Sequence, residues 1–293
     1  MRKYLILVIL AGNLLFAENN FKWNLNNPPA WIKESIEDIN KQIARYSQPN
    51  GIVGMSVKDL TTGQSFSLNS KHPFNPASVI KIPVMIEAFH QRAQGKIKFT
   101  DELTLEQRHK IPGCGNIQFF QNGSSFSIER LVDLMITDSD NTATFMLIEK
   151  LGKHKINSYM RRIGLRKTII KDPSMLNKMA NQHNTSSPED MLKIMDKMYR
   201  GKLVSKKDSE EMLNIMKRQQ HKWGIARFLP ASTIIANKTG SVDFVRNDVG
   251  IIWKNNKPYI ITIFSENLPD NHLGSVMVGA LSKTVFDKYQ PRI

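Results

Sequence analysis

The stretch NPASVIKIPVMIEAF, residues 75–89, contains a lysine in the middle of an apolar segment. The residues from Ser78 to Phe89 are almost all apolar and Pro76 precedes them, so we expect a buried helix that begins near Ser78. Removing the Lys81 ammonium from water costs several kcal/mol unless another group compensates the loss. Either the long Lys81 side chain reaches the surface, or the ammonium is kept inside for a chemical purpose.

The first 17 residues have the pattern of a secretory signal peptide. Arg2 and Lys3 precede a short apolar run, and Ala17 is a small residue at a suitable cleavage point. A membrane anchor is the alternative, but Asn13 interrupts a run already shorter than the ~20 residues needed to span a bilayer. We therefore expect an exported chain, periplasmic or secreted, that is cleaved near Ala17.

Composition narrows the class of function. Cys114 is the only cysteine, and the seven histidines show no zinc-binding spacing, so we expect no disulfide, metal or other cofactor. Loss of Arg2 and Lys3 lowers the formal charge from +15 to +13. This excess indicates either attraction to anionic envelope polymers or membrane surface, or a solvated lysine-rich surface without a partner. No nucleic-acid-binding motif accompanies the charge, and we expect a monomer.

The order of the predicted elements indicates an α+β fold. Residues 29–47 have helical spacing, residues 51–60 and 64–69 resemble two strands, and the pattern is mostly helical from 76 to 220. Three strands then follow within 232–267, and a final helix spans 274–289. We expect one antiparallel sheet built from both chain ends, with flanking helices. The predicted division is a signal peptide (1–17), an α/β lobe (18–75 with 221–293) and an all-α lobe (76–220), with a cleft between the lobes.

Two short motifs with chemically active side chains lie where we expect the cleft. Ser78 and Lys81 are three residues apart, which places both side chains on one face of a helix. A serine is a weak nucleophile without a nearby base, and a buried lysine can act as one because desolvation lowers its pKa. The second motif is SDN, residues 139–141, between two apolar helices. It provides a Ser139 hydroxyl to relay a proton and an Asn141 amide to orient a substrate.

The third motif is KTGS, residues 238–241, at the end of a predicted strand. Lys238 supplies a cation, Thr239 and Ser241 supply hydroxyls, and Gly240 lets a substrate lie close to the strand. Each motif alone is weak, since SDN is also a helix cap and KTG an ordinary turn. Their order and separations along the chain make the combination informative.

With these motifs the chain resembles the penicillin-recognising serine enzymes, specifically class A β-lactamases. The resemblance runs from about residue 30 to the end. PASVIKIPVM is similar to the nucleophile helix of that family, LVDLMITDSDNTATFMLIEKLG to the segment with its second motif, and RFLP with KTGSVDFVRNDVGII to its third. The resemblance implies the β-lactamase/transpeptidase-like fold, and small substrates of the β-lactam or D-Ala-D-Ala type.

The resemblance also implies a role for each motif residue. Ser78 would attack a carbonyl with help from Lys81, while Ser139 passes a proton to the leaving nitrogen and Lys238 sets the electrostatics around it. Three further residues would bind substrate: Asn141 its amide, and Thr239 and Ser241 its carboxylate. The backbone N–H groups of Ser78 and Ser241 would form the oxyanion hole.

One segment departs from the class A pattern. That family hydrolyses its acyl-enzyme with a water activated by a glutamate, whose place, counted from Gly164, falls near Ser174. The stretch DPSMLN contains Asp172 and Asn177 but no glutamate, and Glu189 belongs to the next predicted helix. Asp172 could substitute with a shorter side chain. The usual cysteine before the nucleophile is replaced by Ala77, and Cys114 either lines the cleft entrance or is simply a small loop residue.

Three hypotheses therefore remain open. The chain is a β-lactamase-like hydrolase, a D,D-peptidase or penicillin-binding protein acting on peptidoglycan stem peptides, or a sensor that is acylated without turnover. All three require acylation of Ser78 and differ in the fate of the acyl group.

Overall fold

The computed structural model describes residues 23–25, 28–29, 31–174 and 182–290. The predicted signal peptide and Asn177 lie outside these residues. The strands are β1 (Trp23–Asn24), β2 (Ile52–Asp59), β3 (Ser65–Leu68), β4 (Glu102–Thr104), β5 (Ser125–Ser127), β6 (Ile234–Val242), β7 (Val245–Lys254) and β8 (Lys257–Glu266). The α-helices are α2 (Ile32–Ser47), α3 (Lys81–Ala93), α4 (Ile128–Thr137), α5 (Asn141–Leu151), α6 (Lys153–Arg162), α7 (Pro188–Tyr199), α8 (Lys206–Lys217) and α9 (Asn271–Lys288), and the 3₁₀ turns are η1 (Ala77–Ile80), η2 (Gln107–His109) and η3 (Ile117–Phe119).

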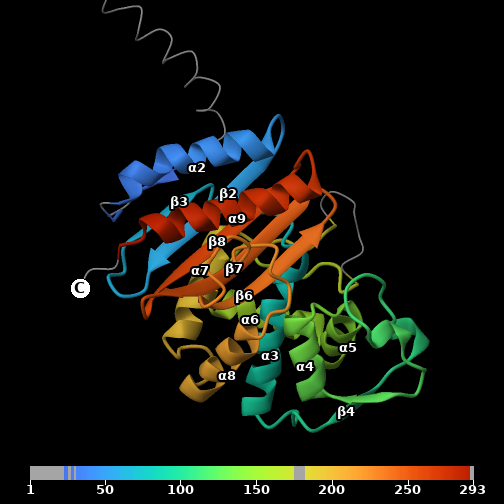
Figure 1. The fold of residues 1–293 in the computed structure, drawn as a ribbon. Helices are drawn as coiled ribbons and strands as arrows, with labels where there is room; N and C mark the ends of the chain where they lie inside the picture. Colours follow the sequence, from blue (N-terminus) through green and yellow to red (C-terminus); the bar gives the residue numbers. More distant parts are fainter. Residues whose placement is uncertain (1–22, 26–27, 30, 175–181, 291–293) are drawn as a thin grey trace, which may run out of the picture.

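A single antiparallel sheet joins the two ends of the chain, as the sequence predicts. Its strand order is β1-β3-β2-β8-β7-β6 (Figure 1). The junction is the pairing of β2 with β8, in which Ile52 lies opposite Glu266 and Asp59 opposite Tyr259. The predicted fold class is confirmed. The lobe boundaries at residues 76 and 220 stay a prediction.

Helices cover both faces of this sheet. α2 and α9 lie across one face, where Ile32, Ile39 and Ile43 of α2 belong to one apolar core with strand residues such as Val53 and Ile261. The other face meets α7 and the helical part of the chain, which share a second core. Because β8 and the second half of β7 are buried on both faces, their sequences there are almost continuously apolar instead of alternating. No helix within the described ranges is long and apolar enough to cross a membrane.

Two predicted boundaries differ in detail from the structure. The final helix begins at Asn271 instead of Gly274, because the Asp270 side chain caps it by accepting a hydrogen bond from the Leu273 N–H. The helix after Pro76 begins as the 3₁₀ turn η1 and becomes α-helical only at Lys81. Pro83 has no N–H to donate to the Val79 carbonyl, so an α-helical bond cannot form there. Ser78 consequently lies in a tight turn before α3.

Candidate active site

A cavity of about 220 Å³ brings together segments that are far apart in the sequence. They are η1 with the residues before it, the loop 112–114, the start of α5, residues near both ends of the segment 172–184, and the end of β6. The described residues that line the cavity are Asn75, Ala77, Ser78, Pro112, Gly113, Cys114, Asn141, Asp172, His183, Asn184, Ser241 and Val242. The cavity therefore contains a residue from each of the three motifs.

Ser78 occupies the second position of η1, directly after a residue with unusual backbone geometry. Ala77 has φ 46°, in the left-handed region that residues other than glycine rarely adopt. The Asn75 side chain accepts a hydrogen bond from the Ala77 N–H at 2.9 Å, and the Asn247 side chain donates to the Asn75 carbonyl at 2.8 Å. These contacts hold the turn so that Ser78 lines the cavity. In a 3₁₀ turn residues i and i+3 are eclipsed, so Ser78 and Lys81 share a face.

Lys81 does not reach the surface. Its side chain is fully buried, and its ammonium donates to the Ser139 carbonyl at 2.6 Å, the Ser139 hydroxyl at 3.2 Å and the Asn141 side-chain oxygen at 2.8 Å. Three donors are the full capacity of a lysine ammonium. The structure therefore excludes the surface-reaching alternative and places the Lys81 nitrogen against the SDN motif.

Ser139 is contacted by both motif lysines. Besides Lys81, the ammonium of Lys238 donates to the Ser139 hydroxyl at 3.0 Å and to the Thr239 carbonyl at 2.8 Å. Ser139 lies between α4 and α5 with φ 59°, a left-handed geometry that costs about 1–2 kcal/mol for a residue with a Cβ. The Asp140 side chain fixes the next turn, because it accepts hydrogen bonds from the N–H groups of Ala143 and Ile117.

Burial changes the acidity of both lysines. Desolvation lowers the pKa of Lys81 well below its ordinary value, and the nearby charge of Lys238 lowers it further. Desolvation also lowers the pKa of Lys238, to about 8, although the carboxylate of Asp248 opposes this change. Both amines therefore release a proton more readily than an exposed lysine does.

Gly240 allows strand β6 to pack closely against the backbone of η1. A Cβ at this position would lie 2.6 Å from the Pro76 carbonyl oxygen and 2.9 Å from the Val79 nitrogen. The close contact is therefore between β6 and the backbone of η1, whereas the sequence assigned it to a substrate. Thr239 and Ser241 flank this contact on β6, a strand at the edge of the sheet, and Ser241 lines the cavity.

Asp172, and not Ser174, lines the cavity in the segment where a glutamate was sought. Ser174 donates to the Asp172 carboxylate from its hydroxyl at 2.7 Å and from its backbone N–H at 2.9 Å. Counting from Gly164 therefore pointed two residues beyond the carboxylate that faces the cavity. Asn177, the other candidate of this segment, lies outside the described residues.

Sequence reasoning missed Asn184 and His183, which also line the cavity. The Asn184 side chain accepts hydrogen bonds from the N–H groups of Lys171 and Asp172, at 2.8 and 2.9 Å, and donates to the Asp172 carbonyl at 3.0 Å. It thus joins the two ends of the segment. These bonds link residues twelve or thirteen positions apart, and no local pattern in the sequence indicates them.

Cys114 lines the cavity and its side chain is exposed, in agreement with the first of its two interpretations. Its carbonyl accepts a hydrogen bond from the Asn141 N–H at 3.0 Å. No group of three metal-ligating side chains occurs within the described ranges, and the cavity lining includes one imidazole and one carboxylate, those of His183 and Asp172.

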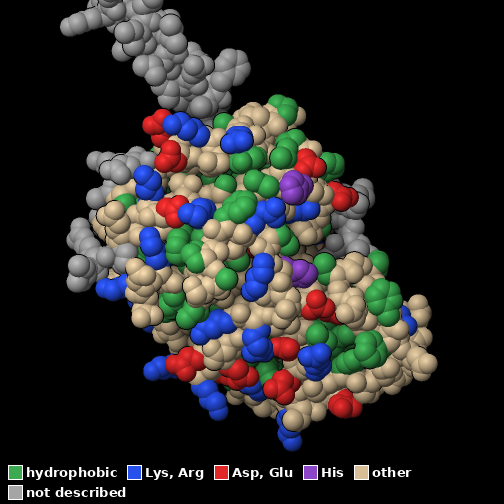
Figure 2. Space-filling view, in the orientation of Figure 1, with side chains coloured by type: hydrophobic (Ala, Val, Ile, Leu, Met, Phe, Trp, Pro, Cys, Tyr) green, Lys and Arg blue, Asp and Glu red, His purple; other side chains and the backbone are tan. Residues whose placement is uncertain are grey.

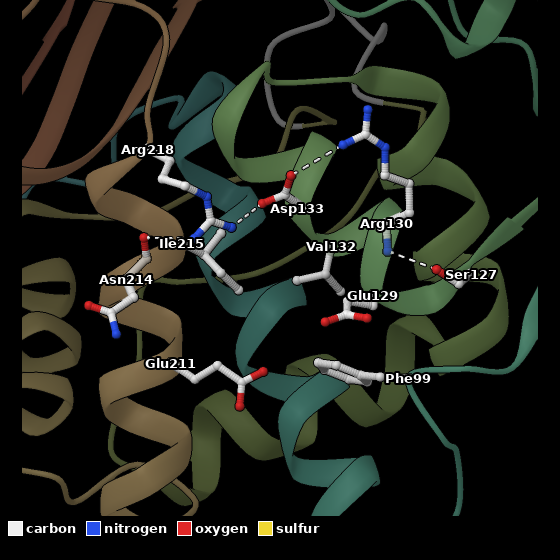
Figure 3. A pocket seen from close by; sticks show the side chains of 10 residues that line it. All are labelled: Phe99, Ser127, Glu129, Arg130, Val132, Asp133, Glu211, Asn214, Ile215 and Arg218. Atoms are coloured by element: carbon white, nitrogen blue, oxygen red, sulfur yellow. Dashed lines mark hydrogen bonds and ion pairs between the residues drawn. The ribbon is translucent and has the colours of Figure 1, made fainter.

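A second cavity, of about 380 Å³, lies between α4 and α8 (Figure 3). Its charged side chains are largely occupied with one another. Asp133 pairs with both Arg130 and Arg218, and Arg92 binds the Glu211 carboxylate beside it. Because it contains none of the three motifs, we do not assign the acyl chemistry to this cavity.

Comparison with known proteins agrees with the motifs. The family model described as "Beta-lactamase enzyme family" matches residues 34–289. The chain belongs to this family. Among curated relatives of this chain, the β-lactamase BRO-1 of Moraxella catarrhalis is 24% identical, over 88% of this chain and 85% of its own length. The β-lactamase VEB-1 of Pseudomonas aeruginosa is 23% identical, over 82% of this chain and 86% of its own length.

Solved structures include two kinds of similar protein. A β-lactamase from Sphaerobacter thermophilus is 28% identical with a TM-score of 0.81, covering 87% of this chain and 99% of its own. PBP-A is 27% identical with a TM-score of 0.81, covering 91% of this chain and 98% of its own. A mutant of PBP-A, 28% identical with a TM-score of 0.80 over 87% of this chain and 96% of its own, was solved as an acyl-enzyme complex with penicillin G.

Proposed function

We propose that this protein is an exported serine hydrolase that opens the ring amide of β-lactams through an ester on Ser78. The observation that carries the proposal is the hydrogen-bonded set of Lys81, Ser139 and Lys238 beside the cavity that Ser78 lines. Membership of the β-lactamase family supports the same reaction.

The first step is the attack of the Ser78 oxygen on the carbonyl carbon of the ring amide. A C–O bond forms, and the proton of the hydroxyl passes to the Lys81 amine. Lys81 is suited to this because burial lowers its pKa well below the ordinary value for lysine, which favours the neutral amine that can accept a proton. The neutral Lys81 amine has only two N–H donors, so it cannot keep all three hydrogen bonds. The longest, to the Ser139 hydroxyl, can reverse, so that the hydroxyl donates to the amine nitrogen.

The second step breaks the C–N bond and needs a proton on the leaving nitrogen. Ser139 can supply it, because Lys238 donates to the Ser139 oxygen and leaves the hydroxyl hydrogen free to point elsewhere. The proton that Ser139 loses is replaced from Lys81, which took it from Ser78. The negative charge on the carbonyl oxygen would meet the backbone N–H groups of Ser78 and Ser241, each typically worth about 3 kcal/mol. Thr239 and Ser241 would bind the substrate carboxylate.

Hydrolysis of the ester is where a second candidate function arises. Asp172 is the one carboxylate among the described residues that line the cavity, and its side chain is shorter than the glutamate of class A enzymes. A water held less well by this group would make the acyl-enzyme long-lived. The short side chain of Asp172, together with the similarity to PBP-A, favours a D,D-peptidase or penicillin-binding protein acting on peptidoglycan stem peptides, or a sensor that does not turn over.

Intact mass measured over time after mixing with a penicillin tests the proposal. We expect an adduct of the penicillin's mass on Ser78 that forms rapidly and then disappears as the ester is hydrolysed. An adduct that persists for hours selects the second candidate. The Ser78→Ala variant, which loses only a hydroxyl, should show no adduct and nearly unchanged thermal stability. Labelling that survives this substitution, or a wild-type protein that forms no adduct, would refute both candidates.

A further inference from the structure

The segment 150–171, which we name the basic segment, has an unusual charge. It contains eight Lys and Arg residues and no Asp or Glu, in a chain that has 26 acidic residues in total. The eight are Lys150, Lys153, Lys155, Arg161, Arg162, Arg166, Lys167 and Lys171. The segment comprises the end of α5, the whole of α6 and the strand-like stretch that leads to Asp172.

The structure turns these cations toward solvent. α6 buries Ile156, Tyr159 and Met160 on one side, and its exposed side presents Lys155, Arg161 and Arg162. Lys150, Arg166 and Lys167 are exposed as well. Among the described residues, the seven cations that precede Lys171 in the basic segment form no ion pair with a carboxylate.

Several basic side chains in other regions pair with a nearby carboxylate. Lys41 pairs with Glu37, Arg200 with Asp196 and Lys283 with Asp287. On the face of the molecule seen in Figure 2, Asp and Glu side chains are interspersed among the Lys and Arg side chains. The basic segment is therefore a continuous source of positive potential, whereas the fields of paired charges largely cancel.

The basic segment is attached directly to the rim of the candidate active site. The Asn157 side chain donates to the Ile170 carbonyl and accepts from the Ile170 N–H, and Lys153 donates to the Lys171 carbonyl. Asn184 then fixes Lys171 and Asp172, and Asp172 lines the cavity. From that rim α6 extends the line of cations by about 15 Å, at 1.5 Å for each of its ten residues.

We propose that the basic segment binds the anionic peptide polymer of the cell wall, so that a strand carrying carboxylates lies along α6 while one of its peptides enters the cavity. This inference rests on the proposed function in its second form, the action of the Ser78 site on peptidoglycan stem peptides, since it assigns the natural substrate class of that site. Single exposed cations contribute little to binding. The partner must therefore present many charges at once, as a polymer does, so that weak contacts add together.

A lipid surface fits the basic segment less well. Helices that lie in a membrane interface insert an apolar face between the headgroups. The apolar face of α6 is instead buried within the protein, and Ile169 is the large apolar side chain of the segment that is clearly exposed, at 37%. The basic segment is therefore better suited to bind a hydrated polyanion than to insert into a bilayer.

Sedimentation of the full chain with purified cell-wall sacculi tests this inference. The variant Lys155→Gln, Arg166→Gln, Lys167→Gln removes three exposed cations that make no side-chain hydrogen bond in the described structure. The matched control Lys202→Gln, Lys206→Gln, Lys207→Gln makes the same change in charge near the start of α8, where all three lysines are exposed. We expect the first variant to bind at least tenfold more weakly at low salt, and the control to bind within twofold of wild type.

Acylation by a soluble fluorescent penicillin, measured on the same proteins, separates this inference from the proposed function. Both variants should be acylated at the wild-type rate, because a small substrate does not touch α6. Equal loss of sacculus binding in both variants, or binding that does not weaken with salt, would overturn the inference. So would wild-type binding to phosphatidylglycerol vesicles without binding to sacculi. Loss of sacculus binding in the first variant alone, in a protein that penicillin never acylates, would refute the proposed function and leave the polymer site standing.

Discussion

At the scale of single residues, the molecule places two ammonium groups against one serine hydroxyl. Lys81 and Lys238 are both fully buried, and both donate to Ser139. Two like charges at such distance disfavour each other, which is one reason why the pKa of Lys81 is lowered. The lysine that stands out in the apolar stretch 75–89 is therefore buried for a reason that packing alone does not supply.

Lys81→Met tests this interpretation. Methionine has a similar length and suits an apolar environment, so the fold should persist, although Ser139 and Asn141 each lose a hydrogen-bond donor. Acylation of Ser78 should slow by about 10²–10⁴-fold, the usual worth of a general base. The measurement is the rate constant for labelling by a fluorescent penicillin, with circular dichroism to check folding. Lys96→Met, which changes an exposed lysine just beyond α3, should leave the rate unchanged. A rate within a few-fold of wild type for Lys81→Met would show that Lys81 is not the base.

The site residues that could be predicted from sequence are those whose partners in a motif lie only a few positions away along the chain. Ser78 with Lys81, Ser139 with Asn141, and Lys238 with Ser241 each stand within four residues of one another. Asn75 and Asn247 could not be predicted, although they hold the turn before Ser78, because their contact joins positions 172 residues apart. A polar residue that acts through a distant backbone carbonyl has no sequence pattern of its own.

At the scale of elements, the helices and the long strands follow from the periodicity of apolar residues, and the short elements do not. β4 and β5 pair over only three residues each, and η1 replaces the expected first turn of a helix. The reason for η1 is visible in the sequence in retrospect, since Pro83 removes the donor that an α-helical turn needs at Val79. The left-handed backbone of Ala77 and Ser139 is not visible, because tertiary contacts impose it.

We expect Asp172 to decide how long an acyl-enzyme lives. Asp172→Asn should lengthen the lifetime of a penicillin adduct by about 10²-fold, because it removes the carboxylate that can take a proton from water. Acylation should be unaffected. The Asn184 bonds go to the backbone of Asp172, so the substitution leaves the ends of the segment 172–184 joined. The measurement is the decay of the adduct by intact mass.

Ser174→Glu is the complementary variant, since Ser174 occupies the place that counting from Gly164 assigns to the glutamate. If this change shortens the adduct lifetime while Asp172→Asn has no effect, the base belongs at position 174, and the assignment of Asp172 as the base is wrong. If Asp172→Asn alone changes the lifetime, the aspartate is the base. Ser174→Ala, which removes only a donor to the Asp172 carboxylate, is the control for a change in loop geometry.

At the scale of the whole molecule, the sheet carries a buried acid behind the active site. Asp248 on β7 lies opposite Thr239 of β6 and is fully buried. Its carboxylate accepts hydrogen bonds from the Asn237 side chain at 3.0 and 3.1 Å and from the Ile225 N–H at 2.8 Å. Desolvation nevertheless raises the pKa of Asp248 to about 6, since the charged form is disfavoured in the interior. The protonation of Asp248 therefore affects both the stability of the fold and the charge near Lys238.

The raised pKa of Asp248 makes the folded state less stable as the pH rises. An acid whose pKa is about 6 when folded and about 3.9 when unfolded binds its proton more tightly in the folded state. Its contribution to stability is therefore fully present below pH 4 and is lost as the pH rises through 6, by about 3 kcal/mol in total. The opposite trend, from carboxylates with lowered pKa such as Asp270, will overlap with it in the wild-type curve.

Asp248→Asn isolates the contribution of this carboxyl group. The Asn237 side-chain oxygen has no hydrogen-bond partner in the described structure, so a rotated Asn237 amide can accept from the new amide group. We expect the variant and the wild type to have similar free energies of unfolding near pH 4, and the variant to be more stable by up to about 3 kcal/mol near pH 7. The measurement is urea unfolding at several pH values. Removing the carboxylate should also lower the pKa of Lys238 further and move the alkaline limit of acylation to lower pH, because Asp248 favours the charged lysine. A stability difference that does not change between pH 4 and 7 would mean that folding does not raise the pKa of Asp248, and would contradict this prediction.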